Sequence, residues 1–165
     1  MSSDIEKPRF ENQPKIVIEN GNMENLEQIV RFNYEIFDGM YENEPYSLEQ
    51  YQDKLKGTEP IIFIAKEDDE LAGDSISFGR DNSFYIWILG VNKKHRGKGI
   101  GSSLLDKNEQ FAQENGYESI SAKVYNVSVE MQRLLKQRGY EVVKVEESET
   151  DPRNTALWFE LKFKG

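Results

Sequence analysis

Hydrophobic and polar positions follow two different patterns in the first third of the chain. Residues 15–20 (KIVIEN) are rich in β-branched side chains, as strands are. From Asn22 the apolar side chains recur with the spacing of a helix, which is expected to end near Gly39. This helical stripe consists of Leu26, Ile29, Val30, Asn33, Ile36 and Phe37. After an acidic loop, Ser47 suits the N-cap of a second helix, with Gln50 three positions later as in a capping box.

Four further segments are rich in β-branched and aromatic residues, which favours strands. They are residues 60–66 (PIIFIAK), 70–79 (ELAGDSISFG), 83–91 (SFYIWILGV) and 119–125 (SISAKVY). Residues 81–82 predict a hairpin turn, a helical stripe ending at Gly116 precedes the last of these strands, and a further helix stops at Gly139. The chain closes with two alternating segments, 140–147 and 155–163, which are expected to pair antiparallel.

In order, the elements are a strand, two helices, three strands, a helix, a strand, a helix and two strands. This order predicts an α/β sandwich with a mixed sheet. Residues 85–125 should form a right-handed strand-helix-strand crossover, which places a glycine-rich turn at the carboxyl end of a strand, where open sheets bind ligands. Residues 1–14 have no periodicity and predict a loose leader, so we expect one folded domain over residues 15–165.

The composition excludes several kinds of chemistry. Cysteine is absent and histidine occurs once, at His95, which leaves no disulfide, no thiolate nucleophile and no multi-histidine site, so no metal is expected. The net charge of −9 disfavours nucleic acid and anionic membranes as partners and favours cationic ones. The chain has no apolar run near the ~18 residues of a membrane helix and no apolar signal-peptide core, so we expect a cytoplasmic location.

Residues 93–103, KKHRGKGIGSS, concentrate positive charge and glycine in an otherwise acidic chain. A helix that begins near Gly99 presents unpaired N–H groups and a positive dipole end, and glycines let a phosphate approach closely. Arg96 and Lys98 add charge, so the segment predicts a diphosphate site, although glycines at such a turn can also serve backbone freedom alone. A Walker loop would need a lysine after Gly101, and a dinucleotide fingerprint would need a third glycine at Ser102.

The segment 91–105, VNKKHRGKGIGSSLL, resembles the acyl-CoA turn of the GNAT superfamily of N-acetyltransferases, whose core pattern is R/Q-x-x-G-x-G/A. Arg96, Gly99 and Gly101 fill that pattern, and Val91 fills the hydrophobic position on the preceding strand. The order of elements from Lys15 to Phe163 also matches the fold of that superfamily. The resemblance implies a three-layer αβα sandwich, with a mixed, mostly antiparallel central sheet splayed between its fourth and fifth strands, and acetyl-CoA as the acyl donor.

The resemblance also implies a cofactor site built largely from the main chain. Backbone groups of Leu89 and Val91 would pair with pantetheine, Gly90 would mark a bulge that opens a slot for the thioester, and the N–H near Leu89 would polarise the acetyl carbonyl. Asn126 or Ser128 would bind pantetheine from the opposite wall. The amides expected to bind the diphosphate of CoA are those of Arg96, Gly97, Lys98, Gly99, Ile100, Gly101 and Ser102.

Acetyl transfer requires the acceptor ammonium to lose a proton, which costs about 4 kcal/mol at neutral pH for a pKa near ~10.4. Many relatives place a Glu on the fourth strand and a Tyr on the last helix, whereas here Tyr85 and Leu135 occupy the corresponding positions. Either water carries the proton to an acidic loop residue, or catalysis has been lost. The acidic candidates are Asp38, Glu42 and Glu44. Tyr85 and Tyr125 are the hydroxyl candidates for a catalytic role.

Acidic residues are frequent in the segment that, by resemblance, covers the acceptor: Glu35, Asp38, Glu42, Glu44, Glu49 and Asp53. Such a run is either a solvated face or a surface that selects a cationic amine, such as a polyamine, an aminoglycoside-like compound or a protein amino group. His95 is expected to flank the turn in solvent. The predicted function is direct acetyl transfer to a primary amine in a ternary complex. The alternative is a noncatalytic acyl-CoA sensor, and a homodimer through the C-terminal strands stays open.

Overall fold

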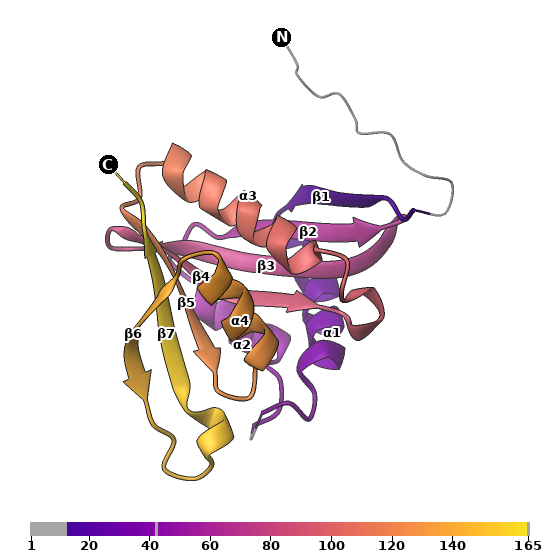
Figure 1. Ribbon diagram of the computed structural model, residues 1–165. Helices are drawn as coiled ribbons and strands as arrows, with labels where there is room; N and C mark the ends of the chain where they lie inside the picture. The colour runs from indigo at the N-terminus through magenta and orange to yellow at the C-terminus, as the bar shows by residue number, and fades with distance from the viewer. Residues whose placement is uncertain (1–12, 42, 165) are drawn as a thin grey trace.

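Seven strands form a single sheet in the computed structural model, which describes residues 13–41 and 43–164 (Figure 1). The strands are β1 (Ile16–Gly21), β2 (Ile61–Glu67), β3 (Glu70–Arg80), β4 (Ser83–Val91), β5 (Ser119–Tyr125), β6 (Glu141–Glu146) and β7 (Ala156–Lys162). The helices are α1 (Leu26–Phe37), α2 (Leu48–Leu55), α3 (Ile100–Glu114) and α4 (Val129–Gln137), with 3-10 turns η1 (Met23–Asn25), η2 (Lys93–His95) and η3 (Pro152–Asn154). This order is the predicted one. The expected leader, residues 1–14, lies outside the described residues except for its last two positions.

The strand order is β1-β2-β3-β4-β5-β7-β6, and every neighbouring pair is antiparallel except β4 and β5. These two strands pair only from Ser83–Ile86 to Ser119–Ala122. Beyond Ile86 they separate, although β4 continues to Val91 and β5 to Tyr125. The predicted splay between the fourth and fifth strands is therefore confirmed.

Helices cover both faces of the sheet, with α3 and α4 on one face and α1 and α2 on the other (Figure 1). Along β4, Phe84 and Ile86 pack with the first pair of helices, whereas Tyr85 and Ile88 pack with the second. Since successive side chains of a strand point to opposite faces, a strand covered on both sides is apolar throughout. The αβα sandwich predicted from the resemblance is confirmed.

The bulge in β4 lies at Trp87. The resemblance had placed this bulge at Gly90, and that expectation is wrong. Ile88 pairs with Ile76 of β3 and Ile86 pairs with Ser77, so Trp87 is the extra residue. Gly90 pairs regularly, but a Cβ there would lie 3.1 Å from Phe37 Cζ of α1. The glycine is needed because α1 packs closely against the strand, and a sequence cannot distinguish that need from a bulge.

A polar cluster lies inside the layer between α1, α2 and β3. Asn33, the one polar position in the α1 stripe, donates from Nδ2 to Tyr51 Oη at 3.1 Å and to Asp74 Oδ1 at 3.0 Å. All three side chains are buried. Burial raises the pKa of Asp74 from 3.8 to about 7, against the opposing effect of the Asn33 hydrogen bond.

Asp74 should therefore make the protein less stable as the pH rises. The unfolded chain loses this proton near pH 4 and the folded chain near pH 7, so between these values the folded state binds more protons and its stability falls with pH. Asp74→Asn removes this dependence while keeping an acceptor for Asn33. Relative to the wild type, the variant should gain on the order of 3 kcal/mol in unfolding free energy between pH 5 and pH 8.

Urea unfolding of both proteins at the two pH values measures that difference. Because the other carboxylates titrate alike in both proteins, their effects cancel in the comparison. A difference that does not change between pH 5 and pH 8 would show that Asp74 is not a buried, protonated acid in the folded protein.

Candidate active site

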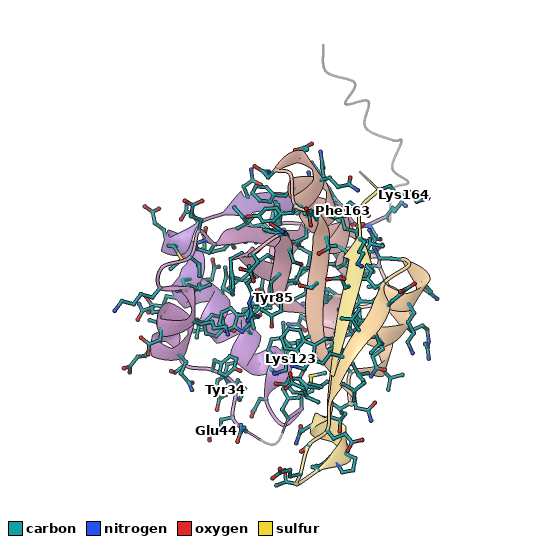
Figure 2. All side chains as sticks on the ribbon, turned by 90° about the vertical axis from the view of Figure 1, so that its left-hand side faces the viewer. Tyr34, Glu44, Tyr85, Lys123, Phe163 and Lys164 are labelled. Atoms are coloured by element: carbon teal, nitrogen blue, oxygen red, sulfur yellow. The ribbon has the colours of Figure 1, made fainter. Side chains whose placement is uncertain are left out.

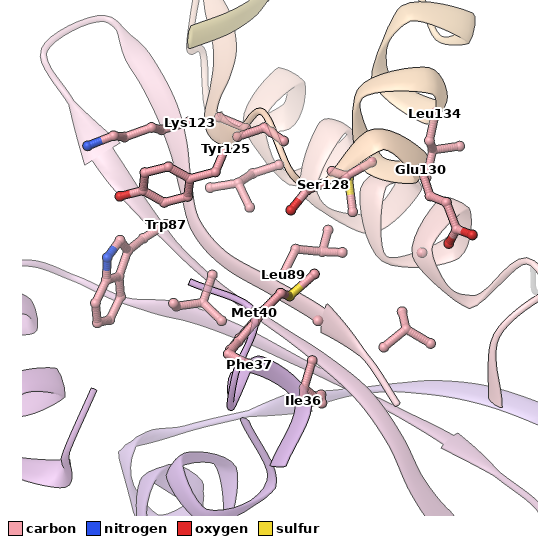
Figure 3. Close-up of a pocket in the computed structure, with 18 of the residues that line it drawn as sticks. Ile36, Phe37, Met40, Trp87, Leu89, Lys123, Tyr125, Ser128, Glu130 and Leu134 are labelled. Atoms are coloured by element: carbon pink, nitrogen blue, oxygen red, sulfur yellow. The ribbon is translucent and has the colours of Figure 1, made fainter. Parts of the chain in front are cut away.

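The splay between β4 and β5 opens a cleft of about 740 Å³. Figure 3 shows Leu89 in this cleft, with Ile36, Phe37 and Met40 on one side and Ser128 on the other. The cleft brings together most of the residues predicted for the site: Tyr85, Leu89, Gly90, Val91, Arg96, Gly97, Gly99, Ile100, Gly101, Ser102 and Ser128. Lys98 and Asn126 do not line it.

The backbone of β4 is unpaired by any strand along the edge that faces the cleft. Asn92 donates its N–H to Ala72 O at 3.0 Å, which is the β3 side of the strand. Because backbone groups of successive residues point to alternate edges, Gly90 also faces β3, and Leu89 and Val91 face the opposite edge. Beyond Ile86, β5 no longer pairs with that edge. It therefore offers hydrogen-bonding groups to an extended ligand.

The turn before α3 ends beside the same edge. Gly97 and Gly99 have φ angles of 78° and 80°, in the left-handed region that favours glycine. Gly99 is the N-cap and has no side chain to bind the first-turn amides, and the helical bonding there begins with Ser103 N–H, which donates to Gly99 O at 2.9 Å. Arg96 Nε donates to Val91 O at 3.2 Å and ties the turn to β4. Free amides at a helix N-terminus beside an arginine suit an anion.

A family model, that of the acetyltransferase (GNAT) family, matches residues 24–140, which include the strand edge and the turn. The chain belongs to this family. It is therefore an acyltransferase, and the activity of GNAT members is acetyl transfer from acetyl-CoA to amines.

Several solved structures share the fold of this GNAT domain. The ribosomal-protein-S18-alanine N-acetyltransferase from Escherichia coli is 16% identical, with a TM-score of 0.74 over 92% of this chain and 97% of that one. NAA60 from Arabidopsis thaliana, solved with a bisubstrate analogue, is 16% identical, with a TM-score of 0.73 over 90% and 98%. Nourseothricin acetyltransferase is 22% identical, with a TM-score of 0.58 over 62% of this chain and 65% of that one. No curated protein matches the sequence directly.

His95 is buried in this GNAT turn, with 4% of its surface exposed, and does not flank the turn in solvent as predicted. Its Nδ1 lies 2.6 Å from Glu67 Oε1 and its Nε2 lies 3.0 Å from Glu70 Oε2. Lys98 Nζ lies 2.6 Å from Glu67 Oε2. Hydrogen bonds from Lys98 and His95 lower the pKa of Glu67. The β2–β3 hairpin thus holds the turn by ion pairs, which no local sequence signal predicts.

His95→Leu should weaken acetyl-CoA binding by loosening this turn. The KM for acetyl-CoA should rise about tenfold, because Glu67 loses a buried partner and the turn loses its anchor. kcat should stay within about twofold, since the variant leaves β4 unchanged. Steady-state kinetics measure both values, and Lys94→Gln is the matched control because its pair with Glu70 is exposed. A wild-type KM in a folded His95→Leu variant would contradict the anchoring role.

Of the two residues suggested for the opposite wall, only Ser128 faces the cleft. Its Oγ lies 3.3 Å from the hydroxyl of Tyr41, which comes from the loop after α1. Asn126 points away, because its Nδ2 donates to Pro152 O at 3.4 Å and its N–H donates to Thr155 O at 2.8 Å. The approach of η3 therefore turns Asn126 out of the site.

Tyr85 is poorly suited to the role of a base. It is 4% exposed and stacks on Trp158, and burial raises its pKa to about 12. Figure 2 shows Tyr85 and Lys123 on the same side of the sheet, with Glu44 on the loop after α1.

Leu135, at the usual acid position, is buried in the core. Tyr125 lines the cleft.

The acidic residues predicted to select a cationic amine are not assembled in the cleft. Glu44 lines it, whereas Glu35 and Asp38 line a separate hollow of about 440 Å³, and Glu42 lies outside the described residues. Glu49 and Asp53 line neither. The sequence reasoning missed several side chains that do line the cleft: Tyr41, Tyr46, Tyr51, Lys54, Trp87 and Lys123. The aromatic residues among them give the same sequence signal as ordinary packing, and the two lysines give no local signal at all.

Among the described residues, no group of His, Asp or Glu side chains is arranged to hold a metal ion. Nor is any helix in that part of the chain long and apolar enough to cross a membrane.

Proposed function

We propose that this protein transfers the acetyl group of acetyl-CoA directly to a primary amine while both substrates are bound. The observation that carries the proposal is the free edge of β4. There Leu89 and Val91 face the cleft, and the uncapped first turn of α3 lines the same cleft. One ligand with a diphosphate and an extended amide arm, as acetyl-CoA has, would satisfy both sets of groups. A protein of the same fold solved with a bisubstrate analogue is consistent with this arrangement.

We assign the cofactor roles as follows. The amides from Gly97 to Ser102 bind the diphosphate, and the groups of Leu89 and Val91 pair with pantetheine. The Leu89 N–H then polarises the acetyl carbonyl as negative charge develops on its oxygen. The amine nitrogen attacks the carbonyl carbon, an amide bond forms, and the carbon–sulfur bond breaks to release CoA as a thiolate. Good orientation alone supplies ~7–11 kcal/mol for such a step.

The protons need two further groups. We assign removal of the ammonium proton to water that leads to Glu44, the one described acidic candidate that lines the cleft. For the leaving thiolate we assign the Tyr41 hydroxyl, which lines the cleft near Ser128 and donates its proton to the sulfur. The attacking nitrogen loses its second proton as the amide forms, and that proton restores the Tyr41 hydroxyl. Burial raises the pKa of Tyr41, which keeps the hydroxyl protonated and able to donate. This pair takes the place of the usual Glu and Tyr of the family.

Two measurements on the wild-type protein test this function. Calorimetry should detect binding of acetyl-CoA and CoA but not of ATP or NAD, because only the CoA arm can pair with β4. A thiol assay with a panel of primary amines should show CoA release that depends on the amine. Binding of acetyl-CoA without release on any amine would instead support the noncatalytic sensor, and tighter binding of ATP or NAD would overturn the assignment of the turn.

A further inference from the structure

The end of the cleft away from the turn is lined by aromatic rings. Tyr46 stacks on Trp87 with ring centroids 5.8 Å apart, and Tyr51 meets Trp87 edge-on at 5.0 Å. Tyr125 closes the other side and packs on Tyr41 at 4.9 Å. Figure 3 shows Trp87, Tyr125 and Lys123 gathered at this end, opposite Glu130 and Leu134. A flat apolar group would fit between these rings.

The charged side chains at this end are mostly positive, although the protein carries a net charge of −9. Lys54 and Lys123 line the cleft there. Of the acidic residues described in the loop after α1, Glu44 is the one that lines it. Neither lysine forms an ion pair with another described residue. This balance is the reverse of what a site for a polyamine requires, because a second cation on the acceptor would meet the two lysines.

Lys123 is the better placed of the two to bind an anion. Its Nζ lies 5.5 Å from the ring centroids of both Tyr125 and Trp158, so the rings hold it at the cleft wall. The nearby carboxylate of Glu146 is engaged elsewhere, since it accepts from Trp158 Nε1 at 2.7 Å and pairs with Lys144 at 3.3 Å. Lys123 is thus half-buried and held by the two rings, and with no ion pair among the described residues its ammonium can pair with a ligand.

We propose that the acceptor is a small primary amine that carries a carboxylate and a flat aromatic group, with Lys123 as the residue that binds the carboxylate. This inference rests on the proposed acetyl transfer and narrows its acceptor. The aromatic group lies among Tyr46, Trp87 and Tyr125, and the amine points toward Leu89. A small acceptor fits because one cleft of about 740 Å³ must also hold the end of the pantetheine arm.

Matched pairs of amines that differ only in the carboxylate provide the test. Tyrosine is compared with tyramine and tyrosinamide, and tryptophan is compared with tryptamine. Putrescine and a tripeptide with a free amino terminus complete the panel. Thiol release should give a kcat/KM at least about tenfold higher for each amino acid than for its decarboxylated partner, the equivalent of one charge-assisted hydrogen bond. Lys123→Met, which keeps the aliphatic stem, should raise the KM for tyrosine about tenfold and leave that for tyramine within about twofold.

A binding measurement separates this inference from the proposed function. Calorimetry of N-acetyltyrosine and N-acetyltyramine needs no turnover, and only the former should lose affinity in Lys123→Met. Lys162→Met is the matched control, because Lys162 is exposed on β7 and does not line the cleft. Equal rates for both members of each pair, or a preference for putrescine or the tripeptide, would overturn this inference and leave acetyl transfer intact. No CoA release with any amine would overturn both.

Discussion

Leu89→Pro is expected to lower kcat by about 10²- to 10³-fold, because it deletes the N–H that polarises the acetyl carbonyl. Proline removes a backbone donor, and a strand tolerates it where that donor faces an open edge. Leu89 meets this condition, since its backbone groups face the cleft and not β3. The sheet should therefore keep its pairing with β3 while the transition state loses a hydrogen bond worth about 3–4 kcal/mol.

Single-turnover kinetics with saturating acetyl-CoA measure this loss apart from binding. Leu89→Ala is the matched control, because it removes a comparable amount of side-chain packing but keeps the N–H. Its kcat should stay within about tenfold of the wild type, with some loss of stability from the partly buried core position. If a folded Leu89→Pro variant turned over as fast as Leu89→Ala, the N–H of Leu89 would have no role in the chemistry.

Gly101→Val is expected to raise the Kd for acetyl-CoA about 100-fold, or about 2.7 kcal/mol. A Cβ on Gly101 would lie 3.4 Å from Leu134 Cδ2 and 3.9 Å from Val91 Cγ2, both of which belong to residues that line the cleft. The Cβ itself fits at ordinary contact distance. The two methyl groups of valine extend beyond it, into the space between the first-turn amides and the β4 edge where the diphosphate is proposed to bind.

Gly101→Ala separates steric exclusion from a damaged helix. Alanine adds only the Cβ and favours a helix over glycine by about 0.5–1 kcal/mol, so it should raise stability and raise the Kd by less than about fivefold. Calorimetry gives both Kd values and thermal unfolding confirms that each variant folds. Wild-type affinity in a folded Gly101→Val protein would place the diphosphate of CoA elsewhere and remove the main support for the proposed cofactor site.

The sequence by itself determined the order of the elements and the position of the turn. The period of apolar residues predicted α1 with its polar interruption at Asn33, and the capping box at Ser47 is present in the structure. The left-handed φ angles of Gly97 and Gly99 belong to residues that sequence analysis had singled out. These features are local, because a period, a cap or a φ angle depends on residues within one or two turns of the chain.

Only the tertiary structure decided which side chains share the site. It placed the bulge at Trp87, buried His95 against Glu67 and Glu70, and turned Asn126 toward η3. It also put Lys123 at the aromatic end of the cleft, which of the described acidic run only Glu44 lines. Each outcome depends on contacts between residues far apart in the chain and on strand register, where a shift of one residue reverses the face of every side chain. Such contacts leave no periodic signal in the sequence.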